Sequence, residues 1–209
     1  MRTFGLTGGI GTGKSTVASL LRERHGVPIV DADRVARDVV APGTDGLAAI
    51  VRAFGPEVLD ASGALDRARM RARIVADPDA RRRLEAITHP RIFAATAEAL
   101  RALADAGHRV AGVEAALMVE TGSWRIHDAV VVVSASPETQ VRRVMARDHV
   151  DEVGARAIVA AQLPVADKER VATVVIRNDA DLDALATEVE RAWATLRAAL
   201  DPVSSARGS

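Results

Sequence analysis

The chain contains no cysteine and no tyrosine, and aromatic residues make up only 2% of its 209 residues. The lack of cysteine excludes disulfides, thiolate catalysis and cysteine-based zinc sites. With so few aromatic rings, the core must be built from alanine, valine, leucine and isoleucine. Hydrophobic residues still make up 48% of the chain, which is enough for the buried core of a globular protein.

The chain also lacks an excess of charge of either sign, because 28 Lys and Arg balance 28 Asp and Glu. This balance argues against a protein that coats nucleic acid, so we expect no nucleic-acid partner. No run approaches the ~18 apolar residues of a membrane span, and the N-terminus lacks the apolar region of a signal peptide. We therefore expect a cytoplasmic enzyme or binding protein, as a monomer or a small homo-oligomer.

Short apolar segments alternate with amphipathic ones along much of the chain. Strands are predicted over residues 2–6, 27–30, 108–114, 129–134 and 172–178, and helices over 14–24, 31–40, 137–147, 152–162 and 182–200. This alternation predicts an α/β fold with a mostly parallel sheet covered by helices on both faces. The stretch over residues 47–106 contains no predicted strand and is mostly helical in character, with turns at FGPE, DASG and DPD.

These patterns divide the chain into four parts. We predict a core of residues 1–33, 109–147 and 169–200, a helical insertion over 34–108, a lid over 148–168 and a disordered tail over 201–209. The lid is predicted because its sequence is polar and directly follows a helix that ends in arginine.

The segment from Gly8 to Ser15 matches G-x-x-x-x-G-K-[ST] at every fixed position, and it lies between a predicted strand and a predicted helix. The glycines let the backbone N–H groups approach a phosphate, and the following helix adds the positive end of its dipole. Lys14 would reach the β- and γ-phosphates, and the Ser15 hydroxyl would bind Mg²⁺. A dinucleotide fingerprint starting at Gly9 fails, because its sixth position is Lys14.

A nucleotide cradle alone does not separate a kinase from a switch. The guanine-reading Asn-Lys-x-Asp of GTPases is missing, and DASG at 60–63 is interpreted as a turn. A kinase needs a carboxylate beside the acceptor hydroxyl and an arginine over the transferring charge. Asp31 and Asp33 follow the second strand and would face the same way if extended; we favour Asp33 as base, and Asp31 could instead cap the next helix. Arg147 supplies the arginine at the start of the lid.

At this point the chain resembles the bacterial dephospho-CoA kinase family along nearly its whole length. The resemblance is carried by LTGGIGTGKSTVA, VPIVDADRVARDVVAPGT, FGPEVLDASGALDR, ADPDARRRLEAITHPRI, EAALMVETG, VVVVSASPETQVRRVMARD, AAQ and VIRN. It implies a P-loop kinase with a nucleotide-binding core, a helical acceptor-binding lobe and a lid. The implied reaction transfers the ATP γ-phosphoryl to the ribose 3′-hydroxyl of dephospho-CoA, with Mg²⁺.

The resemblance also implies roles for individual residues. The base is Asp33, lid contact with ATP falls to Arg147, and acceptor binding includes His89. The ATP contacts are Gly11, Thr12, Gly13, Lys14, Ser15, Thr16, Arg147 and Asn178. Arg67 and Arg71, from an arginine-rich stretch, are candidates for the acceptor's phosphates, although most of that stretch is expected to be a solvated helix face.

Two stretches depart from the family pattern. Where the family often has Asp-x-Pro-Leu-Leu-Phe-Glu, this chain has Glu114 to Glu120 with Ala and Val in place of Pro and Phe. Glu114 keeps a carboxylate that could hold Mg²⁺ through water. Many relatives carry an arginine where this chain has Ile158, and Arg156 or Lys168 are the candidate replacements. Another P-loop small-molecule kinase, with a nucleotide or sugar acceptor, and a non-catalytic nucleotide switch remain the alternatives.

Overall fold

A single five-stranded sheet organises the fold in the computed structural model, which describes residues 1–201. The strands are β1 (Arg2–Gly8), β2 (Ile29–Asp31), β3 (Val110–Glu114), β4 (Ala129–Ser134) and β5 (Val174–Arg177), in the spatial order β2-β3-β1-β4-β5. The pairings of β1 with β3 and β4, and of β4 with β5, are parallel, as predicted. The predicted disordered tail lies, from residue 202 on, outside the described residues.

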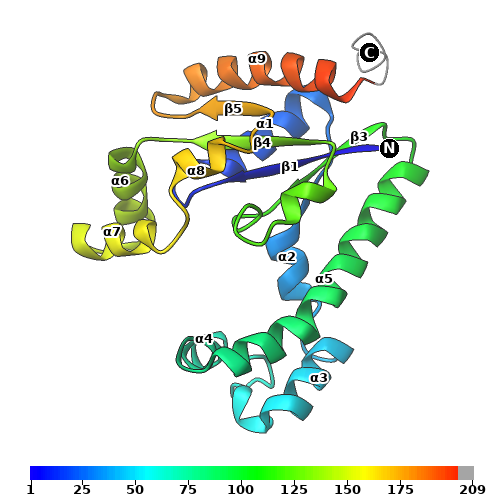
Figure 1. Cartoon of the computed structure of the whole chain (residues 1–209), viewed down its shortest axis with the longest axis vertical. Helices are drawn as coiled ribbons and strands as arrows, with labels where there is room; N and C mark the ends of the chain where they lie inside the picture. Colours follow the sequence, from blue (N-terminus) through cyan, green and yellow to red (C-terminus); the bar gives the residue numbers. More distant parts are fainter. Residues whose placement is uncertain (202–209) are drawn as a thin grey trace. The chain divides into compact units, whose positions relative to one another are not determined.

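One face of the sheet is covered by α1 (Lys14–His25) and α9 (Leu182–Leu200) (Figure 1). The 3.6-residue spacing of leucine and valine in both helices places their apolar faces on the sheet. The core between them is aliphatic, as the scarcity of aromatic residues requires. It includes Leu6 and Val131 from the strands, Leu21 from α1, and Val189 and Leu196 from α9, all 2% exposed or less.

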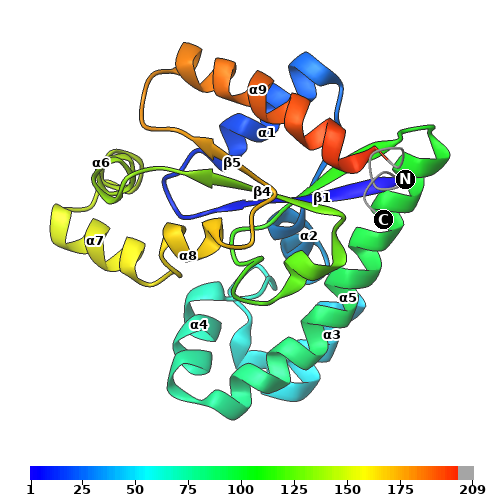
Figure 2. The ribbon, with the colours of Figure 1, turned by 45° about the horizontal axis from the view of Figure 1, so that its top comes forward.

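The other face is covered by the loop 115–127 and by α8 (Val165–Glu169) (Figure 2). Met118 is buried here, and its sulfur lies where a side chain at Gly5 would have to be. Beyond β4, α6 (Pro137–Asp148) and α7 (Glu152–Ala160) share a small apolar cluster that Ile10 joins. Neither α8 nor the short helix η2 (Ser123–Ile126) was predicted, because both are too short to show a helical period.

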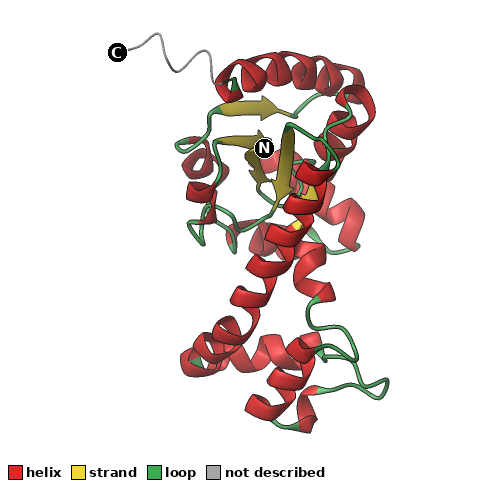
Figure 3. Cartoon of the chain, turned by 90° about the vertical axis from the view of Figure 1, so that its right-hand side faces the viewer, coloured by secondary structure: helices red, strands yellow, loops and turns green. Residues whose placement is uncertain are grey.

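The chain divides into two compact units, residues 1–30 together with the chain from residue 103 onward, and residues 31–102. The second unit consists of α2 (Ala32–Asp38), α3 (Asp45–Phe54), η1 (Pro56–Val58), α4 (Arg67–Ala76) and most of α5 (Pro78–Asp105) (Figure 3). It has its own apolar cluster, which includes Ile50, Phe54, Val58 and Met70. The predicted insertion ends at residue 108, whereas the second unit ends at residue 102. The continuous helix α5 runs from one unit into the other across residue 102.

Two short stretches within residues 31–102 have hydrogen bonds between side chains and the backbone. DASG is a turn, as predicted: Asp60 Oδ1 accepts hydrogen bonds from Ser62 N, Ser62 Oγ and Ala64 N at 2.6–3.1 Å. Thr88, His89 and Pro90 all lie inside the continuous helix α5. Proline removes one backbone donor there, and the Thr88 hydroxyl and the Arg91 guanidinium donate to the carbonyls of Leu84 and Ile87 in the same stretch.

Both tryptophans lie in the first unit. The ring of Trp193 on α9 is 5.3 Å from the ring of His25, and the guanidinium of Arg125 lies over the ring of Trp124 at 4.6 Å. The second unit contains phenylalanine, including Phe54, as its aromatic residue.

His127, in the loop beneath β1, makes the stability of the fold depend on pH. Burial lowers its pKa below the ordinary 6.5, and the charge of Asp128 only partly offsets this. Because the unfolded chain takes up a proton first, stability is complete above pH 6.5 and is lost as the pH falls below that value. Thermal unfolding of wild type should therefore lose more stability between about pH 7.5 and about pH 5.5 than that of His127→Gln.

The matched control is His108→Gln, because His108 is an exposed histidine. It should show the wild-type pH dependence. Equal losses in wild type and His127→Gln would contradict a buried neutral imidazole.

Candidate active site

The glycine-rich loop follows β1 and leads directly into α1. Gly8, Gly11 and Gly13 have φ of 155°, 74° and 89°, values that side chains rarely adopt. Gly13 caps α1 in the left-handed conformation without a side-chain cap. The first N–H groups of the helix are therefore left for an anion, as the sequence pattern predicted.

Crowding by neighbouring residues also requires glycine in this loop. A Cβ at Gly9 would lie 2.6 Å from Gln140 Oε1, one at Gly11 would lie 2.8 Å from the Gln140 carbonyl oxygen, and one at Gly13 would lie 2.3 Å from Asn178 Nδ2. The loop is thus pressed against α6 and the residue after β5. Glycine is therefore needed both for the approach of the backbone to a ligand and for the packing of the loop against Gln140 and Asn178.

Lys14 lies across this loop. Its Nζ donates to the carbonyl oxygens of Gly8 and Gly9, each at 3.1 Å. The Thr12 side chain is fully buried, and its hydroxyl donates to the Gly9 carbonyl at 2.8 Å. Of the predicted ATP contacts, Thr12 is therefore available only through its backbone.

Ser15 lies beside the carboxylate that was predicted to share its metal. The Ser15 hydroxyl donates to Glu114 Oε1 at 3.4 Å, and Glu114, at the end of β3, is only 9% exposed. The parallel pairing of β1 with β3 brings the two strand ends to the same edge of the sheet. Two hard oxygen atoms from neighbouring elements are ligands of the kind that Mg²⁺ takes.

Three side chains far away in sequence hold the loop. Asn178 Nδ2 donates to the Thr12 carbonyl at 2.8 Å, and Arg143 donates to the Gly11 carbonyl and to Asn178 Oδ1, both at 3.2 Å. Gln162 Oε1 accepts from the Ile10 N–H at 2.8 Å. Asn178, predicted as an ATP contact, is 6% exposed, and its side chain holds the loop itself.

Arg147 lies at the end of α6. Its Nε and Nη2 donate to the two carboxylate oxygens of Asp148 at 2.7 Å, and this hydrogen bond raises the pKa of Arg147 and lowers that of Asp148. The helix ends at Asp148, and its C-cap residue His149 has a φ of 54°. A non-glycine residue in this conformation marks the turn between α6 and α7.

The structure explains Ile158 and removes one of its candidate replacements. Ile158 on α7 packs against the apolar cluster of Val141, Val144 and Ala155. Lys168 does not replace the arginine that many relatives carry here, because its side chain is fully buried in an ion pair. Arg156 is exposed and pairs with Glu152 within α7.

In the second unit, the two aspartates of DAD have different environments. Asp31 caps α2, because its Oδ1 accepts from the Arg34 N–H at 2.8 Å. Asp33 is helical and not extended, so the condition under which the two aspartates would face the same way is not met. It lies in the first turn of α2 with an exposed side chain.

The arginine-rich stretch separates into two groups. Arg69, Arg73, Arg81, Arg82 and Arg83 each donate to a backbone carbonyl or a carboxylate. Within residues 1–201, Arg67 and Arg71 have no such partner, and their four-residue spacing places them on one face of α4. His89, on α5, is also exposed.

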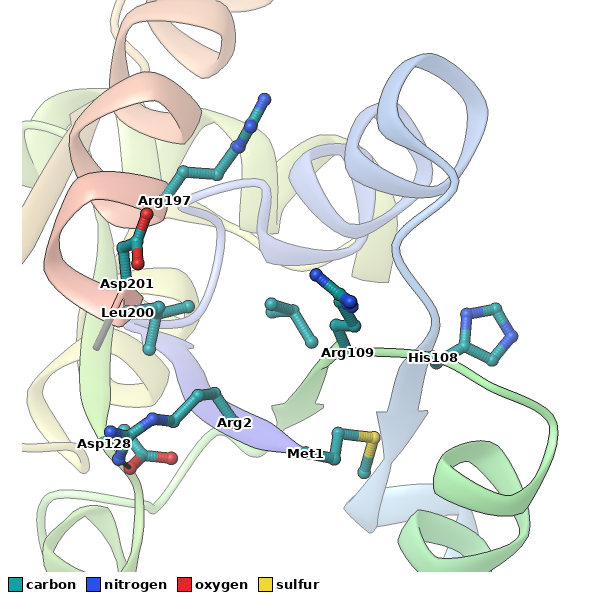
Figure 4. A pocket seen from close by; sticks show the side chains of 9 residues that line it. Met1, Arg2, His108, Arg109, Asp128, Arg197, Leu200 and Asp201 are labelled. Atoms are coloured by element: carbon teal, nitrogen blue, oxygen red, sulfur yellow. Dashed lines mark hydrogen bonds and ion pairs between the residues drawn. The ribbon is translucent and has the colours of Figure 1, made fainter. Parts of the chain in front are cut away.

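A pocket of about 790 Å³ lies at the opposite end of the strands from the glycine-rich loop (Figure 4). Arg2, Arg109 and Arg197 line it, but Asp128 and Asp201 also line it, and Arg2 is paired with Asp128 at 2.6 Å. None of the predicted site residues belongs to it.

Together, a glycine-rich loop between β1 and α1, a lysine and serine at the helix start and a carboxylate at the neighbouring strand end define a P-loop kinase. The chain belongs to the dephospho-CoA kinase family, whose sequence profile matches residues 2–184. It is 51% identical over 197 residues to the dephospho-CoA kinase of Anaeromyxobacter dehalogenans, covering 94% of this chain and 93% of that one. It is 46% identical to that of Streptomyces avermitilis, covering 94% of each chain.

Solved structures agree with this fold. The Thermus thermophilus protein TT1252 superposes with a TM-score of 0.81 at 32% identity, over 96% of this chain and 98% of that one. Shikimate kinase from Bacteroides thetaiotaomicron has a TM-score of 0.52 at 14% identity, over 94% and 98% of the two chains, which shows a shared fold alone. Within residues 1–201, no helix is long and apolar enough to cross a membrane.

Sequence reasoning missed the residues that hold the loop from behind. Gln140, Arg143 and Gln162 are polar residues within otherwise ordinary amphipathic segments. Their one signal in the sequence is a polar residue facing the apolar side of a helix, as at Gln140, which is 4% exposed.

Replacing Gly13 tests whether crowding at the loop controls ATP binding. In Gly13→Ala, the new methyl group would collide with Asn178 Nδ2, so the Asn178–Thr12 hydrogen bond must break or the loop must shift. We expect ATP affinity, measured by calorimetry, to fall by about tenfold or more, because both changes move the N–H groups that face the phosphates.

Gly107→Ala is the matched control. Gly107 has the same φ of 89°, but no atom lies within 4 Å of the place that a new methyl group would take, so the substitution adds only the backbone strain. That strain costs about 1–2 kcal/mol. Equal ATP affinity in Gly13→Ala and Gly107→Ala would show that crowding by Asn178 does not matter.

Proposed function

We propose that this protein transfers the γ-phosphoryl group of ATP to the ribose 3′-hydroxyl of dephospho-CoA, the last step of coenzyme A synthesis. The observation that carries the proposal is the pairing of Ser15 with Glu114 at the mouth of a glycine-rich loop, in a chain of the dephospho-CoA kinase family. The family supplies the acceptor, and the loop supplies the donor site.

In this proposal the donor phosphates lie against the loop. The N–H groups from Gly11 to Thr16 donate to phosphate oxygens, and Lys14 exchanges the Gly8 and Gly9 carbonyls for the β- and γ-phosphates. Asn178 and Arg143 hold the loop against the phosphates while negative charge shifts between their oxygens during transfer. Preorganised donors of this kind stabilise a transition state without rearranging during the reaction.

Ser15 and Glu114 would hold Mg²⁺, directly or through water. Residues 1–201 contain no cluster of three or more histidines or carboxylates suited to a metal, which fits an ion held mainly by phosphates and one or two protein oxygens. When bound, the ion supplies charge neutralisation between the β- and γ-phosphates.

For the acceptor, we assign the base to Asp33. Asp31 uses its carboxylate to cap α2, whereas Asp33 presents an exposed carboxylate in the first turn. Asp33 would accept the proton of the 3′-hydroxyl as the phosphoryl group arrives. His89, Arg67 and Arg71 would contact the acceptor, the two arginines through its phosphates.

We assign to Arg147 the neutralisation of charge on the transferring phosphoryl group. Its side chain is 58% exposed, and its guanidinium donates to Asp148 through Nε and Nη2, which leaves Nη1 for the transferring group. An arginine over the transferring phosphoryl neutralises charge that develops on its oxygens.

An acceptor panel tests the proposed function against its alternatives. We expect ADP release, measured with a coupled assay, to depend on dephospho-CoA and to be far slower with adenosine, AMP, shikimate or gluconate. A faster rate with one of the other acceptors would favour a different small-molecule kinase. Binding of ATP without any acceptor-dependent ADP release would favour a nucleotide switch.

Asp33→Asn tests the base. Turnover should fall by about 10²–10⁴ while ATP affinity stays unchanged, because the amide cannot accept the hydroxyl proton. Loose phosphoryl transfer needs little help from a base, so the fall should lie toward the lower end of this range. Asp38→Asn, at an exposed position of the same helix paired with Arg34, should keep wild-type turnover. Wild-type turnover in Asp33→Asn would move the base elsewhere.

A further inference from the structure

Lys168 and Glu120 form an ion pair in the first unit, between a fully buried lysine and a carboxylate whose side chain is 23% exposed. The Lys168 side chain is fully buried, and its Nζ lies 2.7 Å from Glu120 Oε1. A buried lysine is costly unless its charge is paired and its hydrogen bonds are satisfied. Lys168 meets both conditions, since Nζ also donates to the Ala116 carbonyl at 2.9 Å.

This pair joins two segments that are far apart in sequence. Glu120 and Ala116 belong to the loop 115–127, whereas Lys168 lies on α8. Glu120 Oε1 also accepts from the Leu163 N–H at 3.3 Å, so one carboxylate oxygen holds both ends of the segment 163–168. Breaking the pair would remove a contact that joins this segment to the loop.

The same contacts lie next to both parts of the donor site, which are the Ser15–Glu114 pair and the glycine-rich loop. On one side, Ala116 is only two residues after Glu114, whose carboxylate meets Ser15. The Ala116 carbonyl is fixed by Lys168 and also accepts from the Thr7 hydroxyl of β1 at 3.5 Å. On the other side, Leu163 follows Gln162, whose amide oxygen accepts from the Ile10 N–H of the glycine-rich loop.

We propose that Lys168, through its ion pair with Glu120, is a positioning residue for phosphoryl transfer. It fixes the loop that follows Glu114, and so the distance between Glu114 and Ser15. Because its side chain is fully buried, it would touch neither nucleotide nor acceptor. This inference rests on the proposed function, because it assigns the Ser15–Glu114 pair to the phosphoryl-transfer site.

The proposal predicts a split between turnover and ATP binding. The glycine-rich loop is held separately by Asn178 and Arg143, so losing Lys168 should leave it in place. In Lys168→Met, which keeps the length of the side chain but not its charge, kcat should fall by about tenfold to about a hundredfold. The Kd for ATP should change by less than about threefold, because only transition-state interactions are lost.

A second variant separates positioning from stability. Lys168→Met leaves Glu120 without its cation, so its Tm should fall. In the double variant Lys168→Met/Glu120→Gln no uncompensated charge remains, and the Tm should return toward that of wild type. The kcat should stay low, since the neutral pair no longer holds the Ala116 carbonyl. Lys168→Arg, which keeps the charge and the donors, should recover part of kcat.

The control is Arg170→Met, two residues along the chain. Arg170 is 80% exposed and pairs with Asp167, so its substitution removes the same charge just after the segment 163–168 without touching the loop. It should keep the wild-type kcat and Tm. All variants are measured as the full chain with ATP and dephospho-CoA.

Two results would overturn the proposal. One is a wild-type kcat in Lys168→Met. The other is a kcat that recovers together with the Tm in the double variant, which would make the pair a purely structural contact. If Lys168→Met does not fold, the double variant and Lys168→Arg decide the question. Failure of wild type to phosphorylate dephospho-CoA would instead refute the proposed function, and the variants would then be compared with the acceptor that wild type does use.

Discussion

The close approach of the glycine-rich loop to α6 and to Asn178 is the constraint on which the donor site depends. At Gly9, Gly11 and Gly13 there is no room for a single methyl group. The loop therefore takes one conformation because its outer side is packed like a core. Phosphate binding on its inner side then needs little further ordering, which lowers the entropic cost of binding.

The packing also explains why several polar residues in the first unit point away from solvent. Gln140, Asn178 and Glu114 are each less than 10% exposed, and each makes a hydrogen bond to a backbone group or a hydroxyl in or beside the donor site. Buried polar groups are costly unless they are satisfied, so such a network fixes one arrangement of the loops around it. In this chain, rigidity around the phosphates comes from these side chains as much as from glycine.

The sequence predicted features that depend on neighbours along the chain. The glycine-rich loop, the order of strands and helices, the bounds of α9 and the turn at Asp60 all follow from local spacing and turn chemistry. The contact between Asn178 and Thr12 joins residues 166 positions apart, and no local pattern encodes it. Asp31 and Asp33 show the same limit of local patterns. An extended chain would have pointed both side chains the same way, but Asp31 caps α2 and Asp33 lies inside that helix.

The placement of the tryptophans has a consequence for spectroscopy. With no tyrosine in the sequence and both tryptophans in the first unit, intrinsic fluorescence reports on that unit alone. Circular dichroism, by contrast, records the helices of both units. Trp124 belongs to the loop that Lys168 supports, and its backbone N–H donates to the Met118 carbonyl at 3.3 Å. Its emission is a natural optical probe of that loop, and a comparison of the two signals would resolve the two units without any added label.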